Sequence, residues 1–87
     1  MKYEIQIEKR AKKFIASQDP KQRERIIKAI SLLPVSGDIK PLKGSDNFFR
    51  LRVGSIRILY TLKPKTNEIT IVLVTDAGNR GQIYNGV

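Results

Sequence analysis

Cysteine and histidine are both absent from this 87-residue sequence. Without cysteine, the chain has no disulfide framework, no zinc–thiolate site and no cysteine nucleophile. Without histidine, imidazole acid–base catalysis, a Ser-His-Asp triad and histidine metal sites are excluded. The longest apolar run, Ile71–Val74, is far shorter than the roughly 18 residues that a membrane span needs. Any catalytic chemistry must therefore come from other side chains.

Acidic residues are scarce: 8 Asp and Glu stand against 17 Lys and Arg, which gives a net charge of +9. The acids are scattered, with no pair on an obvious shared face, so the sequence predicts no metal site and no cofactor. The excess of positive charge favours a polyanionic partner: nucleic acid, the ribosome, an acidic protein or an anionic membrane surface. The plain alternative is a charge that only keeps the protein in solution.

The chain length predicts one domain over residues 1–87, because a typical domain has roughly 100–200 residues. A chain of this size buries only about 60–65 % of its unfolded surface, so its stability is expected to be small. The N-terminal stretch MKYEIQIEKR has charges where a signal peptide would have its apolar segment. This favours a cytoplasmic location.

Hydrophobic periodicity in the first third of the chain predicts one strand and two helices. Residues 2–7 alternate between apolar and polar, as in a half-buried strand. Residues 8–18 and 20–33 have apolar residues at helical spacing among lysines and arginines, which predicts two basic amphipathic helices. Asp19 is expected to be the N-cap of the second helix, with Pro20 at its first position.

Strand patterns dominate the rest of the chain. Residues 34–46 are expected to form a loop with Leu42 as its anchor in the core. Three antiparallel strands are expected to follow, over residues 47–53, 56–62 and 68–75. A tight Gly54-Ser55 turn is expected to join the first two of them. The predicted class is α+β, a small antiparallel β-α-α-β-β-β sheet with a helical hairpin packed on one face.

The two faces of the predicted sheet differ in charge. One face is expected to lie under the helices and to hold only apolar side chains: Tyr3, Ile5, Ile7, Phe49, Leu51, Ile56, Ile58 and Tyr60. The opposite, open face displays Arg50, Arg52 and Arg57. Like charges on neighbouring strands destabilise a sheet, so these arginines are either solvated or acid-paired, or placed to meet an anion. A guanidinium matches phosphate oxygens in a bidentate way, which favours phosphate binding.

The C-terminal segment adds Arg80 and Tyr84, which are four residues apart. One face of a helical turn would present both side chains to the same ligand. The plain alternative is that Ile83 and Tyr84 only pin the tail to the core. For an isolated arginine–tyrosine pair, that alternative is the better interpretation.

Three short motifs follow one another along the second half of the chain. They are Leu-x-Gly at residues 42–44, Arg-x-Arg-Val-Gly-x-x-Arg-Ile-x-Tyr at residues 50–60 and Gly-x-Arg-x-x-x-Tyr at residues 78–84. No single motif is specific, but their order and spacing together are. With them, nearly the whole chain resembles the RelE/ParE superfamily of toxin–antitoxin toxins, in particular the RelE-like mRNA interferases.

This resemblance implies a metal-independent ribonuclease that enters the ribosomal A site and cuts mRNA, with the RNA's own 2′-hydroxyl as nucleophile. The family's catalytic basic residues fall on Arg50, Arg52, Arg57 and Arg80, and its catalytic tyrosine falls on Tyr84. Arg57 and Arg80 are expected to clamp the phosphate, while Arg50 and Arg52 orient the RNA. Tyr84 either takes the 2′-hydroxyl proton or stacks on a base.

Other basic residues are candidate contacts to RNA or to the ribosome: Lys9, Lys12, Lys13, Arg23, Arg25 and Lys43. The general acid is left open between Lys43 and Tyr84. Some relatives use histidines and an aspartate at the site. This chain has no histidine and does not have that arrangement.

The resemblance also implies a partner, an acidic antitoxin that wraps around the toxin, with operator DNA bound only through the complex of the two. Two other functions stay open. One is a ParE-like inhibitor of DNA gyrase without nuclease activity, which would share the fold. The other is a nucleic-acid-binding or repressor subunit without catalysis, which rests on the charge alone. Arg80 together with Tyr84 favours the RelE-like interpretation.

Overall fold

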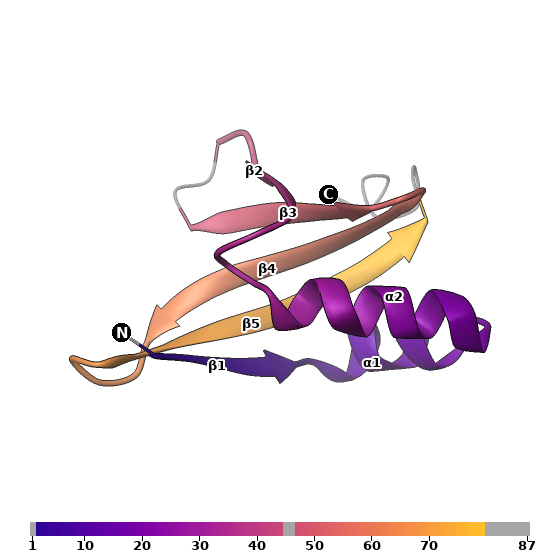
Figure 1. Cartoon of the computed structure of the whole chain (residues 1–87). Helices are drawn as coiled ribbons and strands as arrows, with labels where there is room; N and C mark the ends of the chain where they lie inside the picture. Colours follow the sequence, from indigo (N-terminus) through magenta and orange to yellow (C-terminus); the bar gives the residue numbers. More distant parts are fainter. Residues whose placement is uncertain (1, 45–46, 80–87) are drawn as a thin grey trace.

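The computed structural model describes residues 2–44 and 47–79. Its elements are, in chain order, β1 (Lys2–Ile7), α1 (Lys9–Ala16), α2 (Pro20–Ser31), β2 (Asp38–Pro41), β3 (Phe48–Val53), β4 (Ile56–Pro64) and β5 (Ile69–Asn79). The strands form one sheet, and both helices lie against one of its faces (Figure 1). The predicted α+β class, with a helical layer on one face, is therefore confirmed.

The strands follow the order β1-β5-β4-β3-β2 across the sheet. The β3–β4 and β4–β5 ladders are antiparallel, as expected, and so is the β2–β3 ladder, which was not predicted, whereas β1 runs parallel to β5. The direction of β1 differs from the predicted all-antiparallel sheet because no local turn joins it to β5. The strand β2 lies in the segment that was expected to be a loop. It has 4 residues and includes a proline, so it carries no strand pattern.

Helix α2 begins where the sequence predicts. Asp19 has an extended backbone, and its Oδ1 accepts a hydrogen bond of 2.9 Å from the backbone N–H of Gln22. Pro20 occupies the first helical position, where its missing N–H has no helical partner to lose. The ends of both helices lie within about two residues of the predicted ones.

Replacing Asp19 by alanine is expected to lower the free energy of unfolding by about 0.5–2 kcal/mol, because the N–H of Gln22 loses its acceptor. Asp19→Asn keeps an acceptor oxygen and should retain most of the stability. Urea unfolding followed by circular dichroism measures both variants. Equal losses in the two would show that the cap hydrogen bond is not what Asp19 contributes.

The core lies between the helices and the sheet. The helices contribute Ala11, Ile15, Ile26 and Ile30, each at most 5 % exposed. These pack against buried side chains of the three inner strands and of the segment after α2: Leu33, Leu51, Ile56, Ile58, Tyr60, Val72, Val74 and Ala77. No helix in the described ranges is long and apolar enough to cross a membrane.

Three expectations for the core are wrong. Tyr3 and Ile5 are 40 % and 37 % exposed. They lie on the edge strand β1, most of which extends past the helices, and only Ile7 at its end packs against the core (Figure 1). Leu42 is partly buried but lies outside the core cluster, and Ile39 of β2 packs there instead.

Glycines set the geometry of two connections. Gly54 has φ +61° in the β3–β4 turn, while Ser55 has no positive φ, in agreement with the expected glycine-first turn. Gly37, just before β2, has φ +127°. A Cβ on Gly37 would stand 2.8 Å from Cδ1 of Leu51, which is buried. Only glycine fits there without a shift, and this fixes how β2 is laid against β3.

Tyr60 lies in the core and stacks on Phe49, with ring centroids 5.4 Å apart. Burial raises the pKa of the Tyr60 phenol above its ordinary value of 10.0. The unfolded chain therefore releases this proton at lower pH than the folded protein does. The free energy of unfolding consequently falls as the pH rises above about 10.

We expect Tyr60→Phe to show a smaller loss of stability at alkaline pH than the wild type, because phenylalanine has no proton to release. The measurement is urea unfolding of both proteins at about pH 8 and about pH 11. Lysines lose their charge in both proteins alike, so they cancel in the comparison. The same alkaline loss in both would contradict the assignment to Tyr60.

Candidate nucleic-acid interface

The register of the β3–β4 hairpin brings Arg50, Arg52 and Arg57 together. Arg52 pairs directly with Arg57, and Arg50 pairs with Leu59. Paired residues point to the same side of a sheet, so the three guanidinium groups share one face. That face is opposite to Leu51 and Ile58, which pack under the helices. We call it the arginine face, defined by Arg50, Arg52 and Arg57.

Burial on the arginine face is deeper than expected. The sequence places all three arginines on an open surface, which is wrong for Arg57: it is only 5 % exposed. The Arg50 side chain is 15 % exposed. The physical reason is the position of β4 in the middle of the sheet, where β3 and β5 flank it on both sides. Arg52 remains exposed, and its Nε donates to the carbonyl of Gly54 at 3.4 Å.

Two donor atoms of the arginine face have no hydrogen-bond partner among the described residues. They are Nη1 of Arg57 and Nε of Arg50, and both are buried. A buried donor without a partner is unfavourable and rare in folded proteins. Both atoms belong to cationic groups on the same face. An anion with several acceptor oxygens, such as a phosphodiester, has the chemistry that satisfies them.

Two acidic residues share the arginine face by register, Asp38 of β2 and Asp76 of β5. Asp76 forms an ion pair with Arg10 at 3.5 Å, and among the described residues only Asp38 pairs with an arginine of this face. Oδ1 of Asp38 lies 3.5 Å from Nη2 of Arg50, so the acid-paired alternative applies to that one arginine. Asp38 and its neighbour Lys40 pair with Arg52 and Arg50 in the β2–β3 ladder. The sequence pattern indicates no role for either residue, because both fall in residues 34–46, which were expected to form a loop. The only local signal is Ile39, an apolar residue between Asp38 and Lys40, and this alternation is too short to predict a strand.

The remaining predicted contacts do not gather on the arginine face. Lys9, Lys12 and Lys13 are exposed on α1, on the helical side of the sheet, and Lys43 is exposed between β2 and β3. The predicted residues Arg80 and Tyr84 lie outside the described residues.

The two predicted arginines of α2 have distinct surroundings. The Nη2 of Arg23 donates to the carbonyl of Gln18 at 3.0 Å and to that of Ala16 at 3.5 Å. Arg23 therefore provides a hydrogen-bond donor to carbonyl groups at the C-terminal end of α1, which is a structural role. Arg25 is exposed, and its guanidinium approaches the β3–β4 turn near Gly54. Arg25 is thus the helical arginine that extends towards the hairpin bearing the arginine face.

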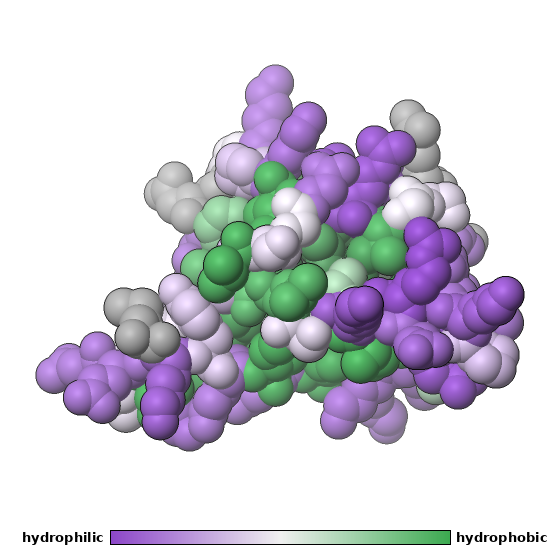
Figure 2. All heavy atoms as spheres, viewed as in Figure 1, coloured by the Kyte–Doolittle hydropathy of each residue, from purple (hydrophilic) through white to green (hydrophobic). Residues whose placement is uncertain are grey.

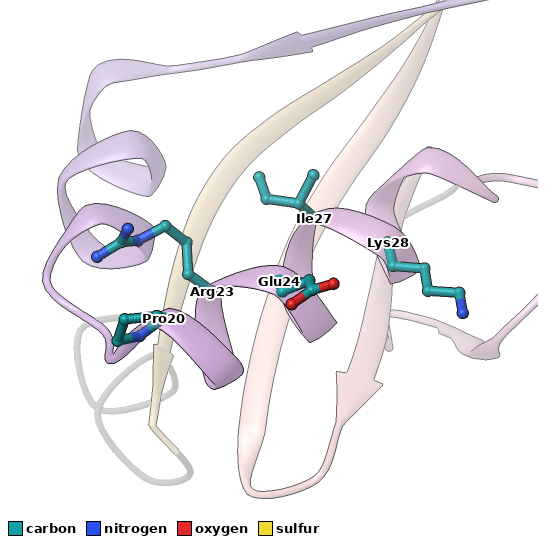
Figure 3. Close-up of a pocket in the computed structure, with 5 residues that line it drawn as sticks. All are labelled: Pro20, Arg23, Glu24, Ile27 and Lys28. Atoms are coloured by element: carbon teal, nitrogen blue, oxygen red, sulfur yellow. The ribbon is translucent and has the colours of Figure 1, made fainter.

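A shallow hollow of about 450 Å³ lies along α2 and is lined by Pro20, Arg23, Glu24, Ile27 and Lys28 (Figure 3). Its charges have both signs, and no buried unpaired polar atom lines it. Apolar surface continues from there around the C-terminal end of α2, where Leu32 and Val35 are exposed (Figure 2). Within residues 2–44 and 47–79, no three acidic side chains are placed to hold a metal ion. The orphaned cationic donors therefore make the arginine face the candidate site.

The sequence matches the family model of the ParE toxin of the type II toxin–antitoxin system parDE over residues 6–82. It is also 34 % identical over 68 residues to a protein of Methanocaldococcus jannaschii named "Putative toxin RelE1". That match covers 71 % of this chain and 76 % of the relative. This chain belongs to the RelE/ParE superfamily. It is a toxin of the type II toxin–antitoxin class, as its motifs predicted.

Solved structures agree with the family. The toxin superposes on the RelB-RelE antitoxin–toxin complex from Methanococcus jannaschii with a TM-score of 0.72 and 26 % identity, over 92 % of this chain and 95 % of that one. The archaeal RelE-RelB complex from Pyrococcus horikoshii gives a TM-score of 0.71 at 19 % identity, over 94 % and 99 % of the two chains. Because this identity is low, the second likeness shows only that the fold is shared.

Proposed function

We propose that this toxin is an endoribonuclease that cuts mRNA in the ribosomal A site and so inhibits translation. The observation that carries the proposal is a pair of buried donors that have no partner among residues 2–44 and 47–79, Nη1 of Arg57 and Nε of Arg50, on one face beside Arg52. No acidic side chain among the described residues satisfies those atoms, since Asp38 approaches only Nη2 of Arg50. An RNA phosphate satisfies them only when it is bound, which is the behaviour of a substrate site.

The proposed reaction transfers one phosphoryl group within the RNA. The ribose 2′-oxygen attacks the adjacent phosphorus, the bond from phosphorus to the 5′-oxygen breaks, and a 2′,3′-cyclic phosphate and a 5′-hydroxyl result. One proton leaves the 2′-hydroxyl and one reaches the 5′-oxygen, so the exchange balances without a metal. Negative charge grows on the phosphoryl oxygens in the transition state. A fixed cation aimed at that charge is worth about 3–4 kcal/mol.

The residues then have these proposed roles. Arg57, together with Arg80, holds the phosphoryl oxygens, since its burial fixes its position before the RNA arrives. Arg50 and Arg52 orient the flanking RNA backbone and share the developing charge. Tyr84 takes the 2′-hydroxyl proton or stacks on a base, and the proton donor to the 5′-oxygen is Lys43 or Tyr84.

An antitoxin is the proposed protein partner. The Methanococcus jannaschii and Pyrococcus horikoshii structures described above are complexes of RelE with RelB, and the first is named an antitoxin–toxin complex. A chain with net charge +9 attracts an acidic segment that folds on binding. In this proposal the antitoxin blocks access to mRNA in the cytoplasm, and operator DNA is bound only through the antitoxin.

Inhibition of DNA gyrase is the second candidate function. The observation that favours it is the match to the ParE toxin family over residues 6–82. This function needs no phosphate-binding cluster, so it leaves the unpaired donors of Arg50 and Arg57 without a use. The two candidates therefore differ in what they require of the arginine face.

Primer extension on an mRNA in a purified translation system tests the proposal. We expect cuts at A-site positions when toxin and ribosomes are both present, and intact mRNA when the ribosomes are left out. Intact mRNA under both conditions would contradict the proposal. A parallel supercoiling assay with purified gyrase then distinguishes the rival, which predicts inhibition of gyrase and no cleavage.

A further inference from the structure

Asp38 is the only acidic residue of β2, β3 and β4, the three strands at the arginine-bearing side of the sheet. It pairs with Arg52 in the β2–β3 ladder, so its side chain lies on the arginine face. Its carboxylate lies 3.5 Å from Arg50 and diagonally across the ladder from it. The preceding Gly37 fixes this placement, because its backbone conformation and its contact with Leu51 allow no side chain.

We propose that Asp38 competes with RNA for Arg50: its carboxylate takes the place of a phosphate oxygen in the free toxin and limits the affinity of the arginine face for RNA. This inference rests on the proposed function, since it assigns a control element to the same site. A carboxylate oxygen and a phosphoryl oxygen are both anionic acceptors for a guanidinium. Occupation of Arg50 by one therefore opposes occupation by the other.

The ion pair has the geometry of one that an incoming ligand displaces. Its 3.5 Å separation is longer than the roughly 2.7–2.9 Å of a strong charge-assisted hydrogen bond. The Asp38 side chain is 53 % exposed, so water solvates it readily once it is released. The carboxylate engages Nη2 of Arg50, and Nε has no partner in the part of the chain that the structure describes. A phosphate reaches both nitrogens and gains a hydrogen bond that Asp38 does not make.

The consequence is that Asp38 lowers the affinity of the arginine face for RNA without preventing RNA from binding. Lys40, Arg50, Arg52 and Arg57 together form a strongly cationic surface, on which an RNA backbone would be held tightly. The Asp38 carboxylate lies at its edge and lowers the potential there, and its ion pair is with Arg50 and not with Arg57. Asp38 thus favours release of cut RNA, while the phosphate clamp itself stays intact.

Binding of a short fluorescein-labelled oligoribonucleotide tests the inference. All its riboses carry 2′-O-methyl groups, so that it binds but is not cut, and fluorescence anisotropy at fixed salt gives the affinity. We expect Asp38→Asn to tighten binding by roughly three- to tenfold, since it removes one charge close to the phosphate. Asp38→Glu keeps the charge and should stay within about twofold of the wild type.

Glu4→Gln is the matched control. It removes the same charge from β1, at the opposite edge of the same sheet, where Glu4 pairs with Lys65 at 3.0 Å. It should change the affinity by less than about twofold. Glu4 pairs with Ile71, and Ile71 pairs with Lys63, which lies roughly 20 Å along β4 from Arg57 and so beyond the screening length. Equal tightening by Asp38→Asn and Glu4→Gln would overturn the inference, since net charge alone would then explain it.

Arg50→Ala separates this inference from the proposed function. The gain from Asp38→Asn should disappear in the Arg50→Ala background, because the competition is for that guanidinium. Weaker binding by Asp38→Asn would overturn the inference and make Asp38 a residue that orients Arg50. If the wild type and Arg50→Ala bind the RNA equally, the arginine face is not the RNA site. That result would contradict the proposed function as well.

Discussion

Arg57→Met is expected to slow mRNA cleavage by about 10²–10³-fold while leaving the protein as stable as the wild type, or more so. Arg57 is 5 % exposed, and its Nη1 has no hydrogen-bond partner among the described residues. Burying this donor therefore lowers the stability of the fold. Methionine fills a similar volume without a donor to satisfy. Relieving an unsatisfied buried donor is expected to add about 1 kcal/mol or more to the free energy of unfolding.

The loss of activity in Arg57→Met should be large. Removing one fixed donor from a developing oxyanion lowers the rate by about 10²–10³-fold. Primer extension over a time course gives the cleavage rate, and urea unfolding gives the stability. Arg57→Lys is the companion variant, since it keeps the charge but lacks the planar fork, and we expect partial activity from it.

In Arg57→Met the cleavage rate is expected to fall, while the free energy of unfolding is expected to stay the same or rise. Replacing a residue kept only for stability would lower the free energy of unfolding and leave the cleavage rate of the folded protein unchanged. A residue kept for substrate binding loses activity alone. If Arg57→Met unfolded at lower urea concentration and cut mRNA at the wild-type rate, Arg57 would be a structural residue. The proposed clamp would then be wrong.

Ile26→Ala is expected to destabilise the protein by about 2–5 kcal/mol, whereas Ile27→Ala should cost less than about 1 kcal/mol. These neighbours on α2 undergo the same chemical change with the same change in helix propensity. Ile26 is fully buried in the core, and Ile27 is 47 % exposed beside the hollow on α2. A domain of this size has a total stability of only about 5–15 kcal/mol, so Ile26→Ala removes a large part of it.

Urea unfolding of the two alanine variants and the wild type checks this difference directly. The larger effect at Ile26 follows from the cavity that alanine leaves in a packed core. Similar losses at both positions would mean that α2 does not present Ile26 to the sheet. The orientation of α2 about its own axis, with Ile26 facing the core and Ile27 facing solvent, would then be incorrect.

The sequence predicted the elements whose cause is local. The alternation of residues 2–7 and the Asp19-Pro20 pair place β1 and the start of α2 correctly. The Gly54 turn places the β3–β4 hairpin. The pairing of β1 with β5 could not be predicted from local patterns, because it joins the first and last described strands. The strand β2 was missed because it is short and exists by pairing with β3.

The same limit applies to the site. A strand pattern tells which face a residue occupies, so Arg50, Arg52 and Arg57 were correctly placed together. It does not tell how many strands flank that residue. The burial of Arg57 and the proximity of Asp38 to Arg50 are consequences of the strand order, and no sequence signal specified either.

Site-specific photo-crosslinking on translating ribosomes tests the central claim, that the arginine face is the surface that meets mRNA. Benzoylphenylalanine is placed at Phe48, which is 38 % exposed and shares a face with Arg50 on β3. The matched control is the same group at Leu32, 50 % exposed and just after α2 on the helical side. We predict cross-links to mRNA from position 48 and none from position 32. Cross-links to mRNA from position 32 alone would contradict the account.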